Sequence, residues 1–174
     1  MKKLIVLLLV ILLVFSLGCT QTKDDATVML EFTKLKQDYK VKESFSPKII
    51  VMNNYINDLS ELRAESSVFV SKILDAELSS AQSFYYLLQA YESSKEINFF
   101  PTKCNIQEIR KAKPYIDTSK FISLSIKSSE EASTRLSPLN ASELEHLRPN
   151  QLLIVKQYAE QAQLLEKELN SICS

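Results

Sequence analysis

Hydrophobic residues recur at helical spacing through most of the chain, and the first clear case lies between residues 25 and 42. Every third or fourth position there is apolar, as on one face of an amphipathic helix. These positions are Val28, Phe32, Leu35 and Tyr39. Asp24 and Asp25 stand at the start of the segment, where acidic side chains cap a helix and suit its dipole. The pattern predicts a helix over 25–42.

A second pattern, over residues 47–95, is the longest in the chain. Ser46 suits the N-cap position, and Pro47 suits the first helical position, where its missing N–H costs nothing. Neither proline nor glycine occurs again before Pro101, and one face stays largely apolar when it is followed at 3.6 residues per turn. The pattern favours one helix over about 47–95, which would be roughly 70 Å long.

The apolar face of this segment is interrupted at Arg63 and Ser67. A turn between two helices usually shifts the phase of the apolar positions, whereas here the phase continues beyond both polar residues. The alternative is that the chain breaks near Glu65-Ser66-Ser67 and forms two helices. The polar stretch marks a weak point in either case.

Proline divides the C-terminal half into shorter elements. Pro101 ends the long segment, and a connector with a short helix follows as far as Lys113-Pro114. A helix over about 118–136 comes next. Its later part, residues 127–135, is polar on nearly all sides, so we expect that part to be exposed.

The end of the chain carries a capping signal and a regular apolar seam. Ser142 and Glu145 have the spacing of a capping box, which predicts a short helical turn. After Pro149-Asn150 the apolar positions repeat in alternating steps of three and four, as in a coiled coil. They are Val155, Tyr158, Ala162, Leu165, Leu169 and Ile172. Such a seam packs within a helical bundle or against another subunit, and we favour the bundle.

Glycine is the most informative feature of the composition. The single glycine is Gly18. Phosphate-binding loops, dinucleotide fingerprints and nucleophile elbows need glycine for positive φ or for close backbone approach, so the rest of the chain lacks these motifs. Tight β-hairpins also depend on glycine. With the helical patterns, this predicts an all-α fold, an elongated and mostly antiparallel bundle of four or five helices.

The N-terminus has the layout of an export signal. Two lysines precede an apolar run over residues 4–15, and small residues follow. Ser16-Leu17-Gly18-Cys19 then resembles the lipobox of prokaryotic lipoproteins. Gly18 and Cys19 match that pattern, whereas the family's usual leucine stands one position before Leu17. The alternatives are an uncleaved membrane anchor and simple secretion.

The resemblance implies that Cys19 is joined to diacylglycerol, a palmitate-type lipid anchor, and that the chain is cut just before it. Residues 1–18 are then the signal peptide, and residues 19–24 are the lipidated N-terminus with a short tether. Residues 25–174 form a single α-helical domain. We expect an exported protein that is lipid-anchored at the cell membrane.

Three cysteines occur, at positions 19, 104 and 173. If Cys19 carries lipid, Cys104 and Cys173 are left as a pair, and exported proteins meet an oxidising environment. A disulfide between them would close a loop of about 70 residues, which the chain-entropy model values at roughly 4 kcal/mol. The alternative is two separate buried thiols.

A basic stretch and an aromatic stretch are the candidate contact surfaces. The basic residues are Lys103, Arg110, Lys111, Lys113, Lys120 and Lys127. They suit anionic lipid headgroups or an acidic envelope polymer, or they form an ordinary solvated face. In residues 84–91, Phe84, Leu88 and Tyr91 share a helical face that is most simply core. Tyr85 and Tyr86 cannot both lie on that face, so Tyr85, Tyr86 and Tyr91 are the candidate residues of a ligand or partner surface. The alternative is that this segment serves only to pack the core.

The sequence contains few residues in the patterns that catalytic or metal sites require. His146 is the only histidine, and Glu143-x-x-His146 has the spacing of half a di-iron site. Such a site needs a second pair of this kind and further glutamates, so a surface or capping histidine is expected. We predict no catalytic residue, no metal and no cofactor.

These features together predict a membrane-anchored, non-catalytic envelope lipoprotein that uses a helical face for interaction or scaffolding. We expect an envelope protein as its partner. The formal net charge is +0, and it is about −2 once the two N-terminal lysines are removed, so nucleic-acid binding is not expected. The alternative function is binding of a small apolar or aromatic ligand between helices near Tyr85–Tyr91.

Overall fold

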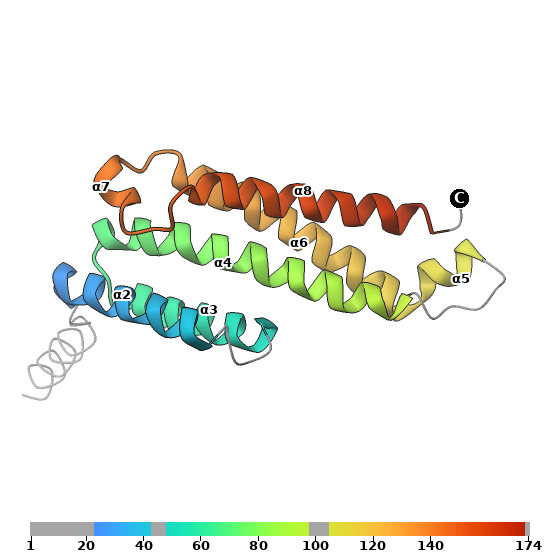
Figure 1. Cartoon of the computed structure of the whole chain (residues 1–174), viewed down its shortest axis with the longest axis horizontal. Helices are drawn as coiled ribbons and strands as arrows, with labels where there is room; N and C mark the ends of the chain where they lie inside the picture. Colours follow the sequence, from blue (N-terminus) through green and yellow to red (C-terminus); the bar gives the residue numbers. More distant parts are fainter. Residues whose placement is uncertain (1–22, 43–47, 98–104, 173–174) are drawn as a thin grey trace, which may run out of the picture.

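The computed structural model describes residues 23–42, 48–97 and 105–172, and these form an all-α bundle (Figure 1). Five long helices and two short ones occur in these ranges, and no strand. They are α2 (Asp25–Lys42), α3 (Lys48–Ala64), α4 (Val68–Lys95), α5 (Ile106–Lys111), α6 (Lys113–Leu136), α7 (Ala141–Leu144) and α8 (Gln151–Asn170). The predicted all-α, elongated bundle is confirmed, as is the first helix over 25–42.

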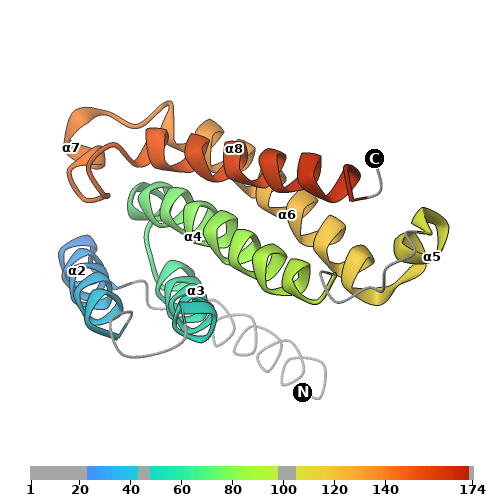
Figure 2. The ribbon, with the colours of Figure 1, turned by 45° about the vertical axis from the view of Figure 1, so that its right-hand side comes forward.

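Consecutive long helices run antiparallel, as Figures 1 and 2 show. The helices α4, α6 and α8 pack together along the long axis, and α4 and α6 share the largest interface. The α2–α3 hairpin lies against α4 on the other side, with α3 as the main contact. The helix α4 is therefore central, because it contacts α3, α6 and α8.

The single helix that the pattern favoured over 47–95 is wrong, and the break near Glu65-Ser66-Ser67 is confirmed. The helix α3 ends at Ala64, and α4 begins at Val68 in the opposite direction. Ser67 is the N-cap of α4, and its side chain accepts a hydrogen bond from the Val70 backbone. The break has a physical reason, because burying a polar side chain without a partner is costly. The turn leaves the Arg63 side chain exposed, and its Nε donates a hydrogen bond to Asp75 at 2.8 Å.

Two predicted boundaries in the C-terminal half also need correction. Pro114 was expected to end a helix, but it lies in the first turn of α6, which begins at Lys113 rather than near residue 118. Proline is tolerated there because the first N–H groups of a helix have no intrahelical partner. The capping box joins Asn140 and Glu143, not Ser142 and Glu145.

Two clusters of buried apolar side chains follow each other along the bundle. One gathers α2, α3, the first part of α4, the end of α6 and the start of α8. The other gathers the later part of α4, α5, the middle of α6 and the later part of α8. The predicted seam of α8 is confirmed, since Val155, Ala162, Leu165 and Leu169 are buried and Tyr158 is partly buried.

The interface between α4 and α6 is built from small residues. Ser83 of α4 and Ser125 and Ser129 of α6 are buried there, and the Ser83 and Ser129 hydroxyls share a hydrogen bond. Ser125 Oγ donates to the Ser83 carbonyl at 2.9 Å, and Ser83 Oγ donates to the Ser125 carbonyl at 3.3 Å. The expected exposure of residues 127–135 is therefore wrong for one face, because hydroxyls that bond locally can be buried between close helices.

The helix α2 is capped as predicted. Asp24 Oδ1 accepts the Thr27 backbone N–H at 2.9 Å, and its other oxygen accepts the Thr27 hydroxyl. The hydrogen bond from the Thr27 hydroxyl has the largest effect and the one from the Thr27 backbone the next largest, and both lower the pKa of Asp24. Its ionised form therefore adds stability above the ordinary aspartate pKa, about 3.9, and this stability is lost as the pH falls through the lowered pKa.

The variant Asp24→Asn tests this cap, because asparagine caps about as well as aspartate but carries no charge. At neutral pH we expect the variant to melt at a lower temperature than the unmodified protein. The difference should close once the pH lies below the lowered pKa of Asp24. Thermal unfolding at a series of pH values measures this, and a constant difference at every pH would contradict it.

Candidate functional site

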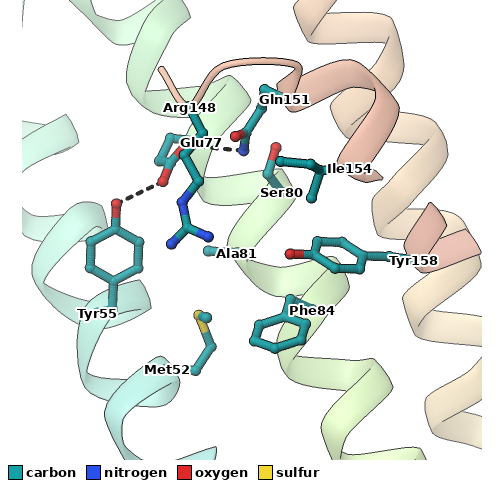
Figure 3. Close-up of a pocket in the computed structure, with 10 residues that line it drawn as sticks. All are labelled: Met52, Tyr55, Glu77, Ser80, Ala81, Phe84, Arg148, Gln151, Ile154 and Tyr158. Atoms are coloured by element: carbon teal, nitrogen blue, oxygen red, sulfur yellow. Dashed lines mark hydrogen bonds between the residues drawn. The ribbon is translucent and has the colours of Figure 1, made fainter. Parts of the chain in front are cut away.

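A buried carboxylate lies where α3, α4 and the start of α8 meet (Figure 3). Glu77 of α4 is only 2 % exposed. Glutamate is rarely buried so fully unless it is paired, because removing the charge from water is costly. Since the surrounding core is mostly apolar, Glu77 and its neighbours are the candidate functional site.

Both carboxylate oxygens of Glu77 are hydrogen-bonded, each to a different element. The Tyr55 hydroxyl of α3 donates to Oε1 at 2.7 Å, and Gln151 Nε2 of α8 donates to Oε2 at 3.2 Å (Figure 3). Burial and then the charge of Glu77 raise the pKa of Tyr55 well above its usual range. Tyr55 therefore stays protonated and remains a donor, and the carboxylate ties α3 and α8 to α4.

Two cationic side chains supply positive charge near Glu77. The Arg148 guanidinium lies over the Tyr39 ring at 5.6 Å and turns toward the pocket between Tyr55 and Tyr158 (Figure 3). Burial acts to lower the pKa of Arg148, but the charge of Glu77 and the nearby phenols outweigh it, so the net shift is upward.

Lys36 is the second cation, and it comes from α2. Its Nζ lies 4.6 Å from the Phe32 ring centroid and donates a hydrogen bond to the His146 carbonyl. Burial lowers the pKa of Lys36, although the charge of Glu77 works in the opposite direction. This contact joins α2 directly to the segment between α7 and α8.

Stacked aromatic rings enclose the polar groups on two sides. Tyr39 stacks on Tyr55 with 4.6 Å between ring centroids, and Phe84 stacks on Tyr158 at 5.0 Å. Between them lies a cavity of about 20 Å³. A cavity needs roughly 10–15 Å³ to hold one water molecule, so this one accommodates a single water and no organic substrate.

The geometry of this site joins three helices. Glu77 has its partners in place, and the cavity leaves no room for a reacting molecule. Within residues 23–42, 48–97 and 105–172, no group of three or more histidines, cysteines and acidic residues could hold a metal ion. The His146 side chain is exposed, and Glu143 serves in the capping box.

The predicted basic residues lie at one end of the bundle and along α6. Arg110 and Lys111 of α5 and Lys113, Lys120 and Lys127 of α6 are all exposed. Lys113 pairs with Asp117, and Lys127 lies 3.9 Å from Glu131. Lys103 lies outside the described residues, as do Cys19, Cys104 and Cys173, so the lipid anchor and the disulfide stay predictions.

The predicted aromatic face of α4 is rotated by one position from the observed core. Leu87 and Ala90 are buried, whereas Leu88 is partly buried and Tyr91 is 39 % exposed. The central position of α4 accounts for the shift, because α4 packs against α3, α6 and α8 and therefore buries more than one face.

Tyr85 and Tyr86 are both partly buried and contact other side chains. Gln89 Nε2 donates to the Tyr85 hydroxyl at 3.0 Å, and the Tyr86 ring stacks on Phe121 at 6.5 Å. The cavity in Figure 3 is lined by Phe84 from this segment and by none of Tyr85, Tyr86 and Tyr91.

The sequence did not predict the Glu77 cluster, by which we mean Glu77 with Tyr55, Gln151, Arg148 and Lys36. One signal was present, because Glu77 lies four residues after Ile73 and four before Ala81, both of which are buried. A lone glutamate in a helix is usually solvated, so this spacing alone does not mark it as buried. Arg148 and Gln151 flank Pro149-Asn150, and only the observed turn brings them to α4. Asn150 has a φ of 60° there.

Comparisons of this chain with protein-family models, with curated proteins and with solved structures found no match. Among the helices of the described residues, none combines the length and hydrophobicity needed to cross a membrane.

Proposed function

We propose that this protein is a membrane-anchored, non-catalytic envelope lipoprotein whose helical bundle serves as an interaction or scaffolding module. The observation behind the proposal is that the two ends of the bundle differ. The chain enters α2 at one end, and α5 with the start of α6 lies at the other (Figure 1). The helix α4 spans the distance between them with 28 residues, which corresponds to about 42 Å.

The entrance of the chain is fixed to the fold. The Lys23 backbone N–H donates to the Glu65 carbonyl at 3.1 Å, and Lys23 Nζ lies 2.7 Å from Glu65 and 2.9 Å from Glu31. Only four residue steps separate Cys19 from Lys23, which reach at most about 14 Å. An anchor on Cys19 would therefore hold this end of the bundle close to the membrane.

The opposite end would then face away from the membrane. Arg110 and Lys111 are exposed there, and Lys120 follows on α6. In this orientation these residues suit an acidic surface on an envelope partner rather than the headgroups of the anchoring bilayer. The Glu77 cluster supports the proposal because it ties α3 and α8 to α4.

Site-specific photocrosslinking in native membranes tests the function. A photoreactive residue in place of Lys111 or Lys120 is expected to capture the same envelope protein from the full-length chain. Glu61, which is exposed on α3 near the entrance, is the matched control position and should not capture it. Failure of both distal positions to yield a specific partner would count against scaffolding.

The anchor itself is tested separately. Mass spectrometry of the mature N-terminus should show Cys19 carrying diacylglycerol, and Cys19→Ala should remove the protein from the membrane fraction. A variant that stays in the membrane with residues 1–18 attached would instead indicate an uncleaved anchor. An unmodified Cys19 in a soluble protein would indicate simple secretion.

We also propose the Cys104–Cys173 disulfide. The start of α6 and the end of α8 are neighbours, since the Tyr115 hydroxyl and Asn170 Oδ1 are 3.4 Å apart. Each cysteine is near one of these segments in the sequence. Mass spectrometry without reduction should find the two cysteines in one linked peptide, whereas alkylation of both thiols would contradict the bridge.

A further inference from the structure

Two large apolar side chains are exposed next to each other at the entrance end of the bundle. Val68 is 81 % exposed and Phe69 is 53 % exposed, and both belong to the first turn of α4. Scattered apolar residues on a surface are ordinary, but two consecutive ones at the tip of a turn form a projecting apolar group.

The position of this pair relative to the incoming chain is fixed by direct contacts. Lys23 is hydrogen-bonded and ion-paired to Glu65, which lies three residues before Val68 in the α3–α4 turn. Lys23, the first described residue, therefore lies at the same turn as Val68 and Phe69. The tether of at most about 14 Å keeps the pair within reach of any lipid attached to Cys19.

We propose that Val68 and Phe69 form a membrane-docking pair that inserts into the interfacial region of the bilayer holding the anchor. The inference rests on the proposed lipidation of Cys19 and adds the orientation of the domain. A lipid on Cys19 holds the chain at the membrane but leaves the domain free to rotate. Burial of a second apolar group at the same end would stop this rotation and fix which side of the entrance end contacts the lipid.

The charges around the pair favour an apolar contact over an electrostatic one. Lys23 is already paired with Glu65 and Glu31, and Asp24 caps α2. Asp25 is the neighbouring acidic residue in the first turn of α2. Lys72, one turn further along α4, is an exposed lysine on the same helix as the pair. One lysine among these acidic groups forms no basic cluster, so docking should occur on zwitterionic lipid and should depend little on salt.

Tryptophan fluorescence gives a direct test, because the chain contains no tryptophan. Phe69→Trp places a single probe in the pair. The full-length lipidated protein is incorporated into phosphatidylcholine vesicles with and without brominated acyl chains. We expect blue-shifted emission and strong quenching by the brominated lipid, with little change between low and high salt.

The matched control is Ile116→Trp. Ile116 is 52 % exposed, close to the exposure of Phe69, and it lies near the start of α6 at the other end of the bundle. Its emission should be unquenched in the same vesicles. A second variant, Val68→Trp, should behave like Phe69→Trp, and circular dichroism verifies that each variant is folded.

The outcomes separate the docking pair from the anchor. Lipidated, vesicle-bound Phe69→Trp that is quenched no more than Ile116→Trp overturns the docking proposal and leaves the anchor intact. An unmodified Cys19 overturns the proposed function first. Blue-shifted emission that depends on protein concentration and persists without vesicles shows a second copy covering the pair, which also overturns membrane docking.

Discussion

Replacing Glu77 with alanine is expected to lower the free energy of unfolding by about 3 kcal/mol, because removing one member of a buried charged network strands its partners. The Tyr55 hydroxyl and the Gln151 amide would lose their acceptor, and Arg148 would keep its charge in a half-buried position. At about 2–4 °C per kcal/mol for a chain of this size, the melting temperature should fall by roughly 6–12 °C.

Two further variants separate the hydrogen bonds from the charge. Glu77→Gln keeps an acceptor for Tyr55 but removes the negative charge, so a loss of about 1–2 kcal/mol is expected. Glu61→Ala on the exposed surface of α3 is the matched control and should change stability by no more than about 0.5 kcal/mol. Equal effects of Glu77→Ala and Glu61→Ala in urea unfolding would show that Glu77 does not hold the helices together.

Enlarging Ser125 to leucine should destabilise the fold by about 3 kcal/mol or more, because a well-packed interface has no room for the added atoms. Ser125 is fully buried between α6 and α4 and exchanges hydrogen bonds with Ser83. The larger side chain would push the two helices apart along their main interface. Urea unfolding followed by circular dichroism measures the loss.

Ser123 provides the control for this prediction, since it lies on the same helix and is exposed. Ser123→Leu should have a small effect, within about 0.5 kcal/mol. Ser125→Ala removes the hydroxyl without adding volume and should cost about 1 kcal/mol. If Ser125→Leu proved no worse than Ser125→Ala, the close packing of α4 and α6 would not be what holds this interface.

Where one strong amphipathic stripe faces one neighbour, the fold follows from the sequence. The helix α2 and the seam of α8 were predicted correctly because their apolar positions are local and regular. Periodicity did not predict the break after α3. The apolar positions on either side of Arg63 and Ser67 have the same helical phase, although the chain turns between them. Packing of α3 back onto α4 decides it, and that contact is not visible in the local sequence.

Helices with several neighbours were harder to interpret. The buried serines of α6 have the same composition as an exposed surface, and only the proximity of α4 gives their burial a reason. Glu77 illustrates the same limit for the candidate site. Its partners come from positions 22 and 74 residues away along the chain, so no local pattern brings Tyr55 and Gln151 to it.

The contact between Lys23 and Glu65 also determines how the protein would respond to mechanical force. A pull on the chain before Lys23 loads the α3–α4 turn through this backbone bond and ion pair, and not the length of α2. The turn continues directly into α4, the longest helix among the described residues, which reaches the far end of the bundle. Tension between the two ends would therefore be transmitted along α4. The helix α2 would unfold and lengthen the chain only after the contact between Lys23 and Glu65 has broken.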